Sequence, residues 1–127
     1  MRREIITTSD GSTTIHLPEW NENYHSKHGA IQEAKHVFIA NGLSLFKDKS
    51  IAILEIGFGT GLNAFITFLE SREMKIDVDY VGVEAYPISE TEISSMNYVA
   101  ALNVNDQNEV FKKMHNIVWE EKTKISE

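Results

Sequence analysis

The sequence predicts a protein of the α/β class that contains the first part of a parallel sheet. Residues 51–56, Ile-Ala-Ile-Leu-Glu-Ile, form a short and nearly continuous apolar run, which is typical of a strand buried on both faces of such a sheet. Three closely spaced glycines follow directly, then residues 62–72 with apolar side chains at helical spacing, and then a second strand candidate at residues 76–84. The order of strand, helix and strand predicts a right-handed βαβ unit.

The residues before this unit predict a hairpin followed by a helix. Within residues 5–17, two runs rich in Ile and Thr flank Ser9-Asp10-Gly11-Ser12, and Asp-Gly between β-formers is a strong turn signal. Residues 30–41 have apolar positions at helical spacing. We expect Gly42 to end that helix as a C′ glycine, the position that favours a left-handed backbone.

Two further helices are expected after the second strand candidate. Ser89 and Glu92 match a capping box at the start of a helix that the apolar spacing extends to Ala100. The apolar positions within residues 110–114 predict a last helix, which Trp119 and a charged tail follow.

Length and composition exclude several classes of protein. A chain of 127 residues suits one domain with a modest core, and no apolar run approaches the roughly 18 residues that would indicate a membrane span. The charged start and the strand-like residues after it do not match a signal peptide. The absence of cysteine excludes disulfides and thiolate zinc sites, and it fits a cytoplasmic location. The net charge of −7, without a dense Lys/Arg cluster, argues against tight nucleic-acid binding by this chain alone.

The glycine loop is the clearest sign of a ligand site. Gly57, Gly59 and Gly61 stand between the first strand and its helix, where glycine permits a positive φ and a close approach of the ligand to the backbone. The helix that follows offers unpaired N–H groups at its start. Glu84 lies near the end of the second strand candidate, where an acid can accept hydrogen bonds from ribose hydroxyls. Loop and acid together predict a ligand that contains a ribose.

The pattern apolar-apolar-acid-apolar-G-x-G-x-G, which ends at Gly61, resembles the first motif of S-adenosyl-L-methionine-dependent methyltransferases, and this resemblance favours S-adenosyl-L-methionine as the ligand. The pattern is G-x-G-x-G rather than the dinucleotide fingerprint G-x-G-x-x-G, and Leu62 stands where that fingerprint has its third glycine. Glu55 precedes the loop, and its carboxylate suits a ligand with a free amine better than one with a pyrophosphate. Two alternatives stay open at this point: a nicotinamide or flavin nucleotide, and a glycine turn that only packs a helix on a strand.

Several segments together resemble a known family of enzymes. These are Tyr24-His25-Ser26, Gly29-Ala30, Glu33, His36-Val37-Phe38-Ile39, the loop from Glu55 to Asn63, and Val83-Glu84-Ala85-Tyr86-Pro87-Ile88. The chain resembles, over about residues 5–90, the S-adenosyl-L-methionine-dependent methyltransferase domain of the bifunctional enzymes that complete 5-methylaminomethyl-2-thiouridine at the tRNA wobble position. It is similar also to their stand-alone relatives, which lack the flavin oxidase domain. The resemblance implies a Rossmann-like fold preceded by the hairpin and helix.

The resemblance also implies a set of cofactor-binding residues. The glycine loop and Asn63 would surround the methionine part of the cofactor, Glu84 would hold the ribose, and Tyr86 or Pro87 would lie against the adenine. The complete set expected from the sequence is Tyr24, Glu33, Glu55, Gly57, Phe58, Gly59, Gly61, Asn63, Glu84, Ala85 and Tyr86.

The first part of the chain would cover this site. Residues 1–46, the hairpin and helix, would form a wall through Tyr24, Gly29 and Glu33, and residues 47–127 would supply the βαβ part. A packing role for Tyr24 and a solvent-exposed position for Glu33 are equally open.

The implied activity is N-methylation of 5-aminomethyl-2-thiouridine in tRNA, with a flavin oxidase domain or protein as a further partner. The family has an acidic Asp-x-Phe-x-Pro motif at the methyl-transfer site, and this sequence has no match to it, so no catalytic residue is predicted. The sheet also stops short of the about seven strands of such enzymes, so the chain looks truncated relative to the family. The alternative function is a non-catalytic cofactor-binding fragment or interaction module, and its incomplete sheet makes a homo-oligomer an expected state.

Other constellations predict no further site. His25, His28 and His36 do not match a zinc signature, so we expect no metal and interpret them as surface or capping residues. Trp20 and Trp119 are interpreted as packing residues rather than platforms for bases. The sequence contains neither a nucleophile elbow nor a P-loop.

Overall fold

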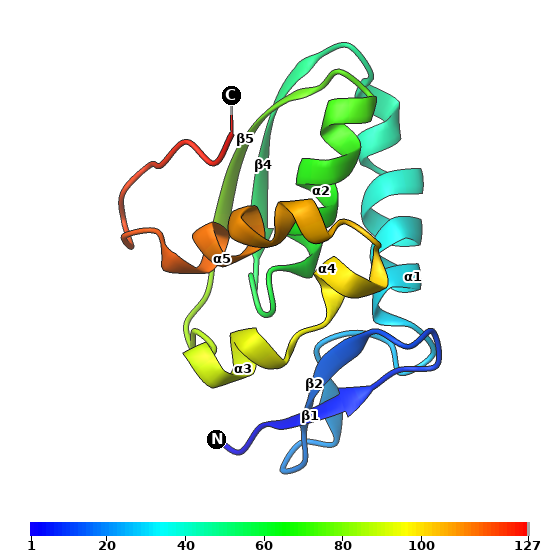
Figure 1. Ribbon diagram of the computed structural model, residues 1–127, viewed down its shortest axis with the longest axis vertical. Helices are drawn as coiled ribbons and strands as arrows, with labels where there is room; N and C mark the ends of the chain where they lie inside the picture. Colours follow the sequence, from blue (N-terminus) through cyan, green and yellow to red (C-terminus); the bar gives the residue numbers. More distant parts are fainter. Residues whose placement is uncertain (127) are drawn as a thin grey trace.

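A computed structural model describes residues 1–126, which fold around one antiparallel and one parallel sheet (Figure 1). The antiparallel sheet has the strand order β1-β2-β3, with β1 at Glu4–Thr7, β2 at Thr13–Leu17 and β3 at Glu22–Asn23. The predicted hairpin is confirmed, because β1 and β2 pair through the Asp-Gly turn. Gly11 in this turn has φ +88°, a conformation that favours glycine.

The helix after the hairpin begins on hydrogen-bond acceptors that the hairpin supplies. Helix α1 (Ala30–Ala34) has no side-chain cap of its own. Its first three N–H groups donate instead to the Thr8 hydroxyl, the Ser12 hydroxyl and the Asp10 carboxylate. These bonds satisfy donors that a helix start otherwise leaves unpaired, and they join the hairpin to α1.

The helical path continues beyond α1 and ends where the sequence predicts, because Asn41 is its C-cap and Gly42 is the C′ residue. A π-helical segment, η1 (Lys35–Ala40), follows α1, and a 3₁₀ segment, η2 (Leu43–Phe46), comes after Gly42. Gly42 ends the helix without the left-handed backbone that is common at C′, since its φ is −137°. Glycine is needed there for space, because a Cβ atom would lie 2.7 Å from the carbonyl oxygen of Phe38.

The predicted order of strand, loop, helix and strand is confirmed in the second part of the chain. Strand β4 (Ser50–Ile56) leads into helix α2 (Leu62–Glu73), and β5 (Asp77–Val83) returns parallel to β4. Helix α2 lies between this sheet and the α1–η1 segment (Figure 1). Most of the core lies around α2, where Leu62, Phe65 and Ile66 are almost fully buried.

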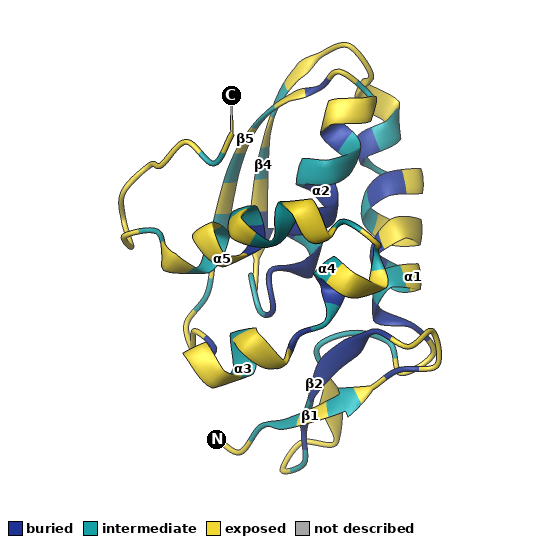
Figure 2. Cartoon of the chain, viewed as in Figure 1, coloured by how far each residue is buried: buried dark blue, intermediate teal, exposed yellow. Residues whose placement is uncertain are grey.

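The parallel sheet is covered on only one face within the described residues, contrary to the expectation of strands buried on both. Leu54 and Ile56 of β4 are 65% and 76% exposed, and Val81 and Val83 of β5 are 53% and 47% exposed. The reason is that α2 packs on the opposite face, where Ile53 is partly buried against the core. Figure 2 shows the difference, with buried residues concentrated on α2, α1–η1 and β2 rather than on the parallel strands.

The single helix expected over residues 89–100 is interrupted. The capping box of Ser89 and Glu92 is present at the start of α3 (Glu90–Ser95), but the chain turns at Asn97 before α4 (Tyr98–Ala101). The Asn97 side chain accepts a hydrogen bond of 2.9 Å from the Thr13 N–H and donates one of 2.9 Å to the Gly11 carbonyl. Because these hydrogen bonds hold Asn97 against the hairpin, the helix does not continue from α3 into α4.

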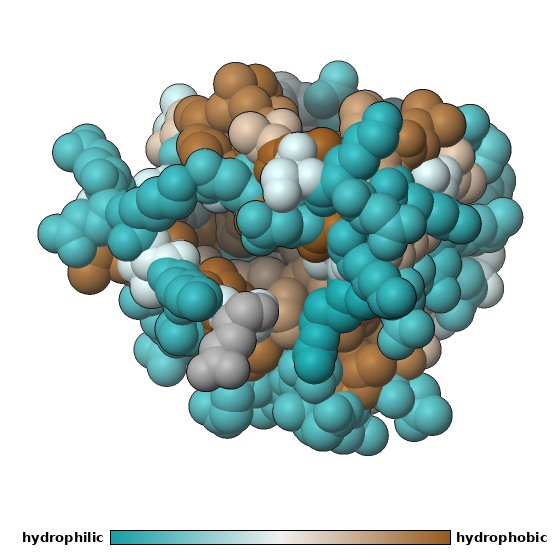
Figure 3. All heavy atoms as spheres, turned by 90° about the horizontal axis from the view of Figure 1, so that it is seen from above, coloured by the Kyte–Doolittle hydropathy of each residue, from teal (hydrophilic) through white to brown (hydrophobic). Residues whose placement is uncertain are grey.

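The last helical elements are the short η3 (Asn105–Gln107) and the predicted helix α5 (Asn108–Asn116). The Phe111 ring of α5 contacts those of Phe65 and Tyr98 edge to face, which attaches α5 to the core. Seen from above, the surface alternates hydrophilic side chains with several hydrophobic patches, and hydrophobic atoms lie at the floor of a hollow (Figure 3). None of the helices in residues 1–126 combines the length and the apolar character needed to cross a membrane.

Candidate cofactor-binding site

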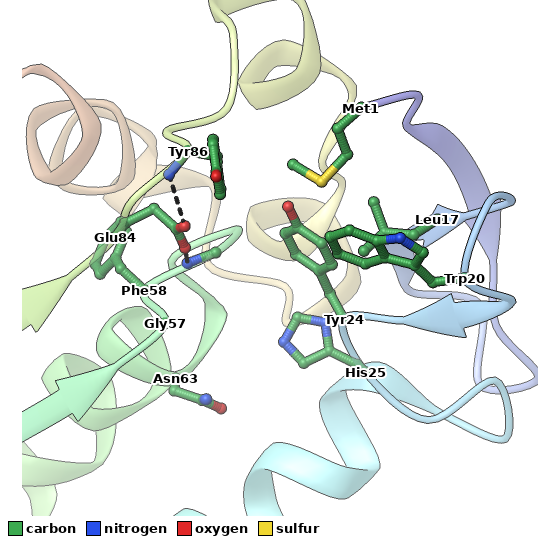
Figure 4. Close-up of a pocket in the computed structure, with 11 residues that line it drawn as sticks. Met1, Leu17, Trp20, Tyr24, His25, Gly57, Phe58, Asn63, Glu84 and Tyr86 are labelled. Carbon is green, nitrogen blue, oxygen red and sulfur yellow. Dashed lines mark hydrogen bonds between the residues drawn. The ribbon is translucent and has the colours of Figure 1, made fainter.

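A pocket of about 320 Å³ lies between the carboxyl ends of β4 and β5 and the antiparallel sheet (Figure 4). The carboxyl edge of the strands is where open α/β sheets bind their ligands. Residues from both parts of the chain line the pocket: Met1, Leu17, Trp20, Tyr24, His25, Gly57, Phe58, Gly59, Asn63, Glu84 and Tyr86.

The glycine loop has the backbone conformation that its sequence predicts. Gly57, Gly59 and Gly61 have φ values of +86°, +57° and +76°, which L side chains rarely adopt. Gly59 also lies against the Tyr24 ring, because a Cβ atom there would be 3.1 Å from Cδ2 of the tyrosine. A Cβ atom at Gly61 would lie 2.9 Å from Nε2 of His115. The loop therefore needs glycine both for its turn and for its neighbours.

Glu84 joins the glycine loop to the end of β5. Its carboxylate accepts hydrogen bonds from the N–H groups of Gly59, at 2.8 Å, and Tyr86, at 3.0 Å (Figure 4). Phe58 also attaches the loop to β5, because its ring packs directly on Gly82 of that strand. A Cβ atom at Gly82 would lie 2.6 Å from Cδ2 of the Phe58 ring. Gly82 is thus a supporting residue that the sequence patterns did not reveal.

Glu55 lies beneath the pocket rather than on its wall. The side chain is buried, and its carboxylate accepts hydrogen bonds of 2.8 Å from the Asn63 amide and from the Tyr80 hydroxyl. Burial raises the pKa of Glu55, and these two hydrogen bonds oppose the rise. Because the amide nitrogen of Asn63 donates to Glu55, the amide oxygen is the group of Asn63 that remains for the pocket.

The opposite wall comes from the N-terminal part of the chain. Tyr24 and His25 follow β3, and Trp20 lies at the same wall although it is 59% exposed. Nδ1 of His25 is 2.8 Å from the Thr14 hydroxyl, and burial lowers the pKa of this histidine to about 4.

Arg3 fixes this wall relative to the segment after β5. Its guanidinium donates to the Tyr86 carbonyl at 3.0 Å and pairs with the Glu92 carboxylate at 2.9 Å. Both side chains of the pair are mostly shielded from solvent. The pocket therefore has walls that hydrogen bonds hold together.

The structure brings most, but not all, of the predicted residues to the pocket. Four of them are absent from its lining, namely Glu33, Glu55, Gly61 and Ala85. Glu33 is partly exposed on α1, and Ala85 is exposed beside Glu84. The role of each predicted residue in cofactor binding stays a prediction.

Four lining residues were not among the expected set: Met1, Leu17, Trp20 and His25. The closeness of Trp20 and His25 to Tyr24 in the sequence was the available signal. In the part of the chain that the structure describes, no group of three or more His, Asp or Glu side chains is placed to hold a metal ion.

The β4–α2–β5 unit with its glycine loop defines the first part of a Rossmann-like fold, and the comparisons agree with this class. The structure is similar to the crystal structure of MNMC2 from Aquifex aeolicus, with a TM-score of 0.63 and 34% identity, over 70% of this chain and 31% of that one.

Curated relatives carry the name tRNA 5-methylaminomethyl-2-thiouridine biosynthesis bifunctional protein MnmC. The protein of Leptospira interrogans is 31% identical over 99 residues, which are 71% of this chain and 15% of the relative. That of Burkholderia multivorans is 36% identical over 86 residues, which are 63% of this chain and 13% of the relative. No family model matches the chain. The predicted resemblance to these tRNA wobble-uridine proteins is therefore confirmed, although the chain spans only about 15% of the length of the relatives it matches.

Proposed function

We propose that this chain binds S-adenosyl-L-methionine and forms the cofactor-binding part of a methyltransferase. The observation that carries the proposal is the glycine loop, in which three glycines with positive φ line or support a pocket and the Glu84 carboxylate closes one end. A structural glycine turn would need neither the pocket nor the carboxylate. The G-x-G-x-G spacing and the similarity to MnmC proteins favour this cofactor over a dinucleotide.

The residues present fit such a cofactor. Glu84 keeps lone pairs for ribose hydroxyls beside its two backbone donors, and the exposed Tyr86 ring offers a face for adenine. The Asn63 amide oxygen is available to an ammonium group. When bound, the cofactor would supply an activated methyl group, and the chain would contribute mainly by positioning it.

The acceptor we propose is the amine of 5-aminomethyl-2-thiouridine at the tRNA wobble position. The support is the biosynthetic step that the name of the relatives gives, the formation of 5-methylaminomethyl-2-thiouridine in tRNA. An attacking amine must be neutral, and no side chain of this chain is assigned as its proton acceptor. The net charge of −7 suggests that tRNA is contacted by other parts of the enzyme or by a partner, and a flavin oxidase domain or protein is one such partner. The setting would be the cytoplasm, where tRNA is modified.

A second function is favoured by the open face of the parallel sheet. Four apolar side chains of β4 and β5 are about half or more exposed there: Leu54, Ile56, Val81 and Val83. Exposed apolar area of this kind marks interaction surfaces. The chain would then be a cofactor-binding module without activity of its own, whose sheet a second copy or another chain covers.

Calorimetric titration of the purified chain tests the proposed function. We expect S-adenosyl-L-methionine and S-adenosylhomocysteine to bind and NAD not to bind. The Gly59→Val variant serves as a control, since a side chain at this φ and beside Tyr24 should block the site. Binding of NAD without a response to S-adenosylhomocysteine would overturn the proposal. Methyl transfer by the chain alone would exclude the second function.

A further inference from the structure

The side chain of His25 presents a single nitrogen to the pocket. Its Nδ1 is 2.8 Å from the Thr14 hydroxyl, and Nε2 has no hydrogen-bond partner within residues 1–126. Since no buried side-chain nitrogen or oxygen in that range lacks a partner, Nε2 must be accessible. The ring lines the pocket and points from the N-terminal wall toward the glycine loop (Figure 4).

Thr14 determines which nitrogen of the ring carries the proton. Thr14 is fully buried, and within the described part of the chain its hydroxyl hydrogen-bonds to His25 alone. If Nδ1 carried the proton, the hydroxyl would accept it, and the hydroxyl's own hydrogen would be left buried without an acceptor. The hydroxyl therefore donates to Nδ1, and the proton of the neutral ring is on Nε2. Burial, which lowers the pKa of His25 to about 4, keeps the ring neutral near pH 7.

Asn63 offers the complementary group on the facing wall. Its amide nitrogen donates to Glu55, so its oxygen is left as an acceptor. Glu84, the carboxylate on the pocket wall, lies with Tyr86 at a different end from His25 in Figure 4. A ligand carboxylate near His25 would thus avoid repulsion from Glu84.

We propose that His25 and Asn63 form the subsite for a zwitterionic α-amino acid group, in which Nε2–H of His25 donates to the carboxylate and the Asn63 oxygen accepts from the ammonium. The assignment rests on the proposed function, since the amino acid group is that of S-adenosyl-L-methionine. Thr14 is a positioning residue that orients His25 by its hydroxyl.

The test compares three ligands by calorimetry on the full chain. S-Adenosylhomocysteine carries the whole amino acid group, its decarboxylated form lacks only the carboxylate, and 5′-methylthioadenosine lacks the entire group.

The variant is Thr14→Val with His25→Phe, because removing both partners together leaves no buried hydroxyl unpaired. We expect its affinity for S-adenosylhomocysteine to fall about 10- to 100-fold, the usual loss for a hydrogen bond to a charged group. The affinities for the other two ligands should not change. His28→Phe, at an exposed histidine of the same segment, is the matched control and should bind all three as the wild type does.

The outcomes separate this subsite from the proposed function. An equal loss of affinity for all three ligands in the double variant would show that His25 has a purely structural role. An unchanged affinity of this variant for S-adenosylhomocysteine would also overturn the subsite. If the wild type binds none of the three, the proposed function fails and the subsite fails with it. Long-range ¹H–¹⁵N correlation spectra of the wild type without ligand give an independent reading. They should show the Nε2–H form of His25, and a ring protonated at Nδ1 would contradict the assignment.

Discussion

The Glu84 carboxylate accepts a hydrogen bond of 2.8 Å from the backbone N–H of Gly59, so one side chain links the end of β5 to the glycine loop. The second carboxylate oxygen accepts from the Tyr86 N–H at 3.0 Å, which turns the chain immediately after the strand. Glu84 therefore has two roles in the proposed site, since it shapes the loop and also offers free lone pairs to a ligand. Each role makes the site sensitive to its removal.

Replacing Glu84 by Ala should weaken the binding of S-adenosylhomocysteine by about 1.5–3 kcal/mol, the range for hydrogen bonds to a charged group. Calorimetry gives the affinity, and circular dichroism confirms that the variant is folded. Glu90→Ala, at an exposed glutamate nearby in the sequence, should leave the affinity unchanged. A folded Glu84 variant with wild-type affinity would remove Glu84 from the site.

Gly59→Val should abolish binding of the same ligand. The residue has φ +57°, and a Cβ atom would lie 3.1 Å from the Tyr24 ring, so a branched side chain strains the backbone and displaces the wall. Gly11→Val is a matched control, because Gly11 has φ +88° but a Cβ atom there would meet nothing within 4 Å. The control should lose stability through backbone strain and keep its affinity. Equal affinities of the two variants would show that the loop does not face the ligand.

The free energy of unfolding should decrease as the pH is lowered, over a pH range that the titration of His25 determines. Burial lowers the pKa of His25 from 6.5 to about 4, so folding favours the neutral ring. The contribution of His25 to the free energy of unfolding is therefore fully present above pH 6.5. It is lost as the pH falls from 6.5 toward 4, and the loss is at most about 3 kcal/mol. Burial also lowers the pKa of His115, which acts in the same direction.

Urea denaturation at several pH values measures this loss. The variant with Thr14→Val and His25→Phe should lose less unfolding free energy between pH 7 and pH 5 than the wild type. An identical pH dependence of the two proteins would show that His25 is not responsible.

Local patterns were sufficient to predict the parts of the fold that local interactions determine. The hairpin turn at Asp10-Gly11, the loop after β4 and the capping box at Ser89 all depend on neighbouring residues. The break at Asn97 could not be predicted, because it depends on hydrogen bonds to Gly11 and Thr13, far away in the sequence.

The same distinction applies to the candidate site. The spacing of the glycines indicates a ligand loop directly, and Glu84 follows from its place after a strand. His25 could not be assigned from its own segment, since its orientation depends on the hydroxyl of Thr14 in β2. Glu55 had the right type and position in the sequence, but its side chain is buried outside the pocket lining, where its carboxylate accepts from Asn63 and Tyr80.

The last prediction concerns the open face of the parallel sheet. Leu54 and Val81 are register partners in β4 and β5, and they are 65% and 53% exposed. Apolar side chains gathered on one sheet face are poorly tolerated by water, so we expect the purified chain to self-associate through this face. Sedimentation velocity should show a dimer or a larger species.

Leu54→Glu combined with Val81→Lys should give a monomer. The two new side chains have opposite charges, which are compatible with each other across the strands but not with an apolar interface. Leu45→Glu, at a leucine on η2 that is 68% exposed, is the matched control and should keep the oligomer. A wild-type chain that sediments as a stable monomer would contradict the prediction and weaken the second function, because the open face would then persist in water without a partner.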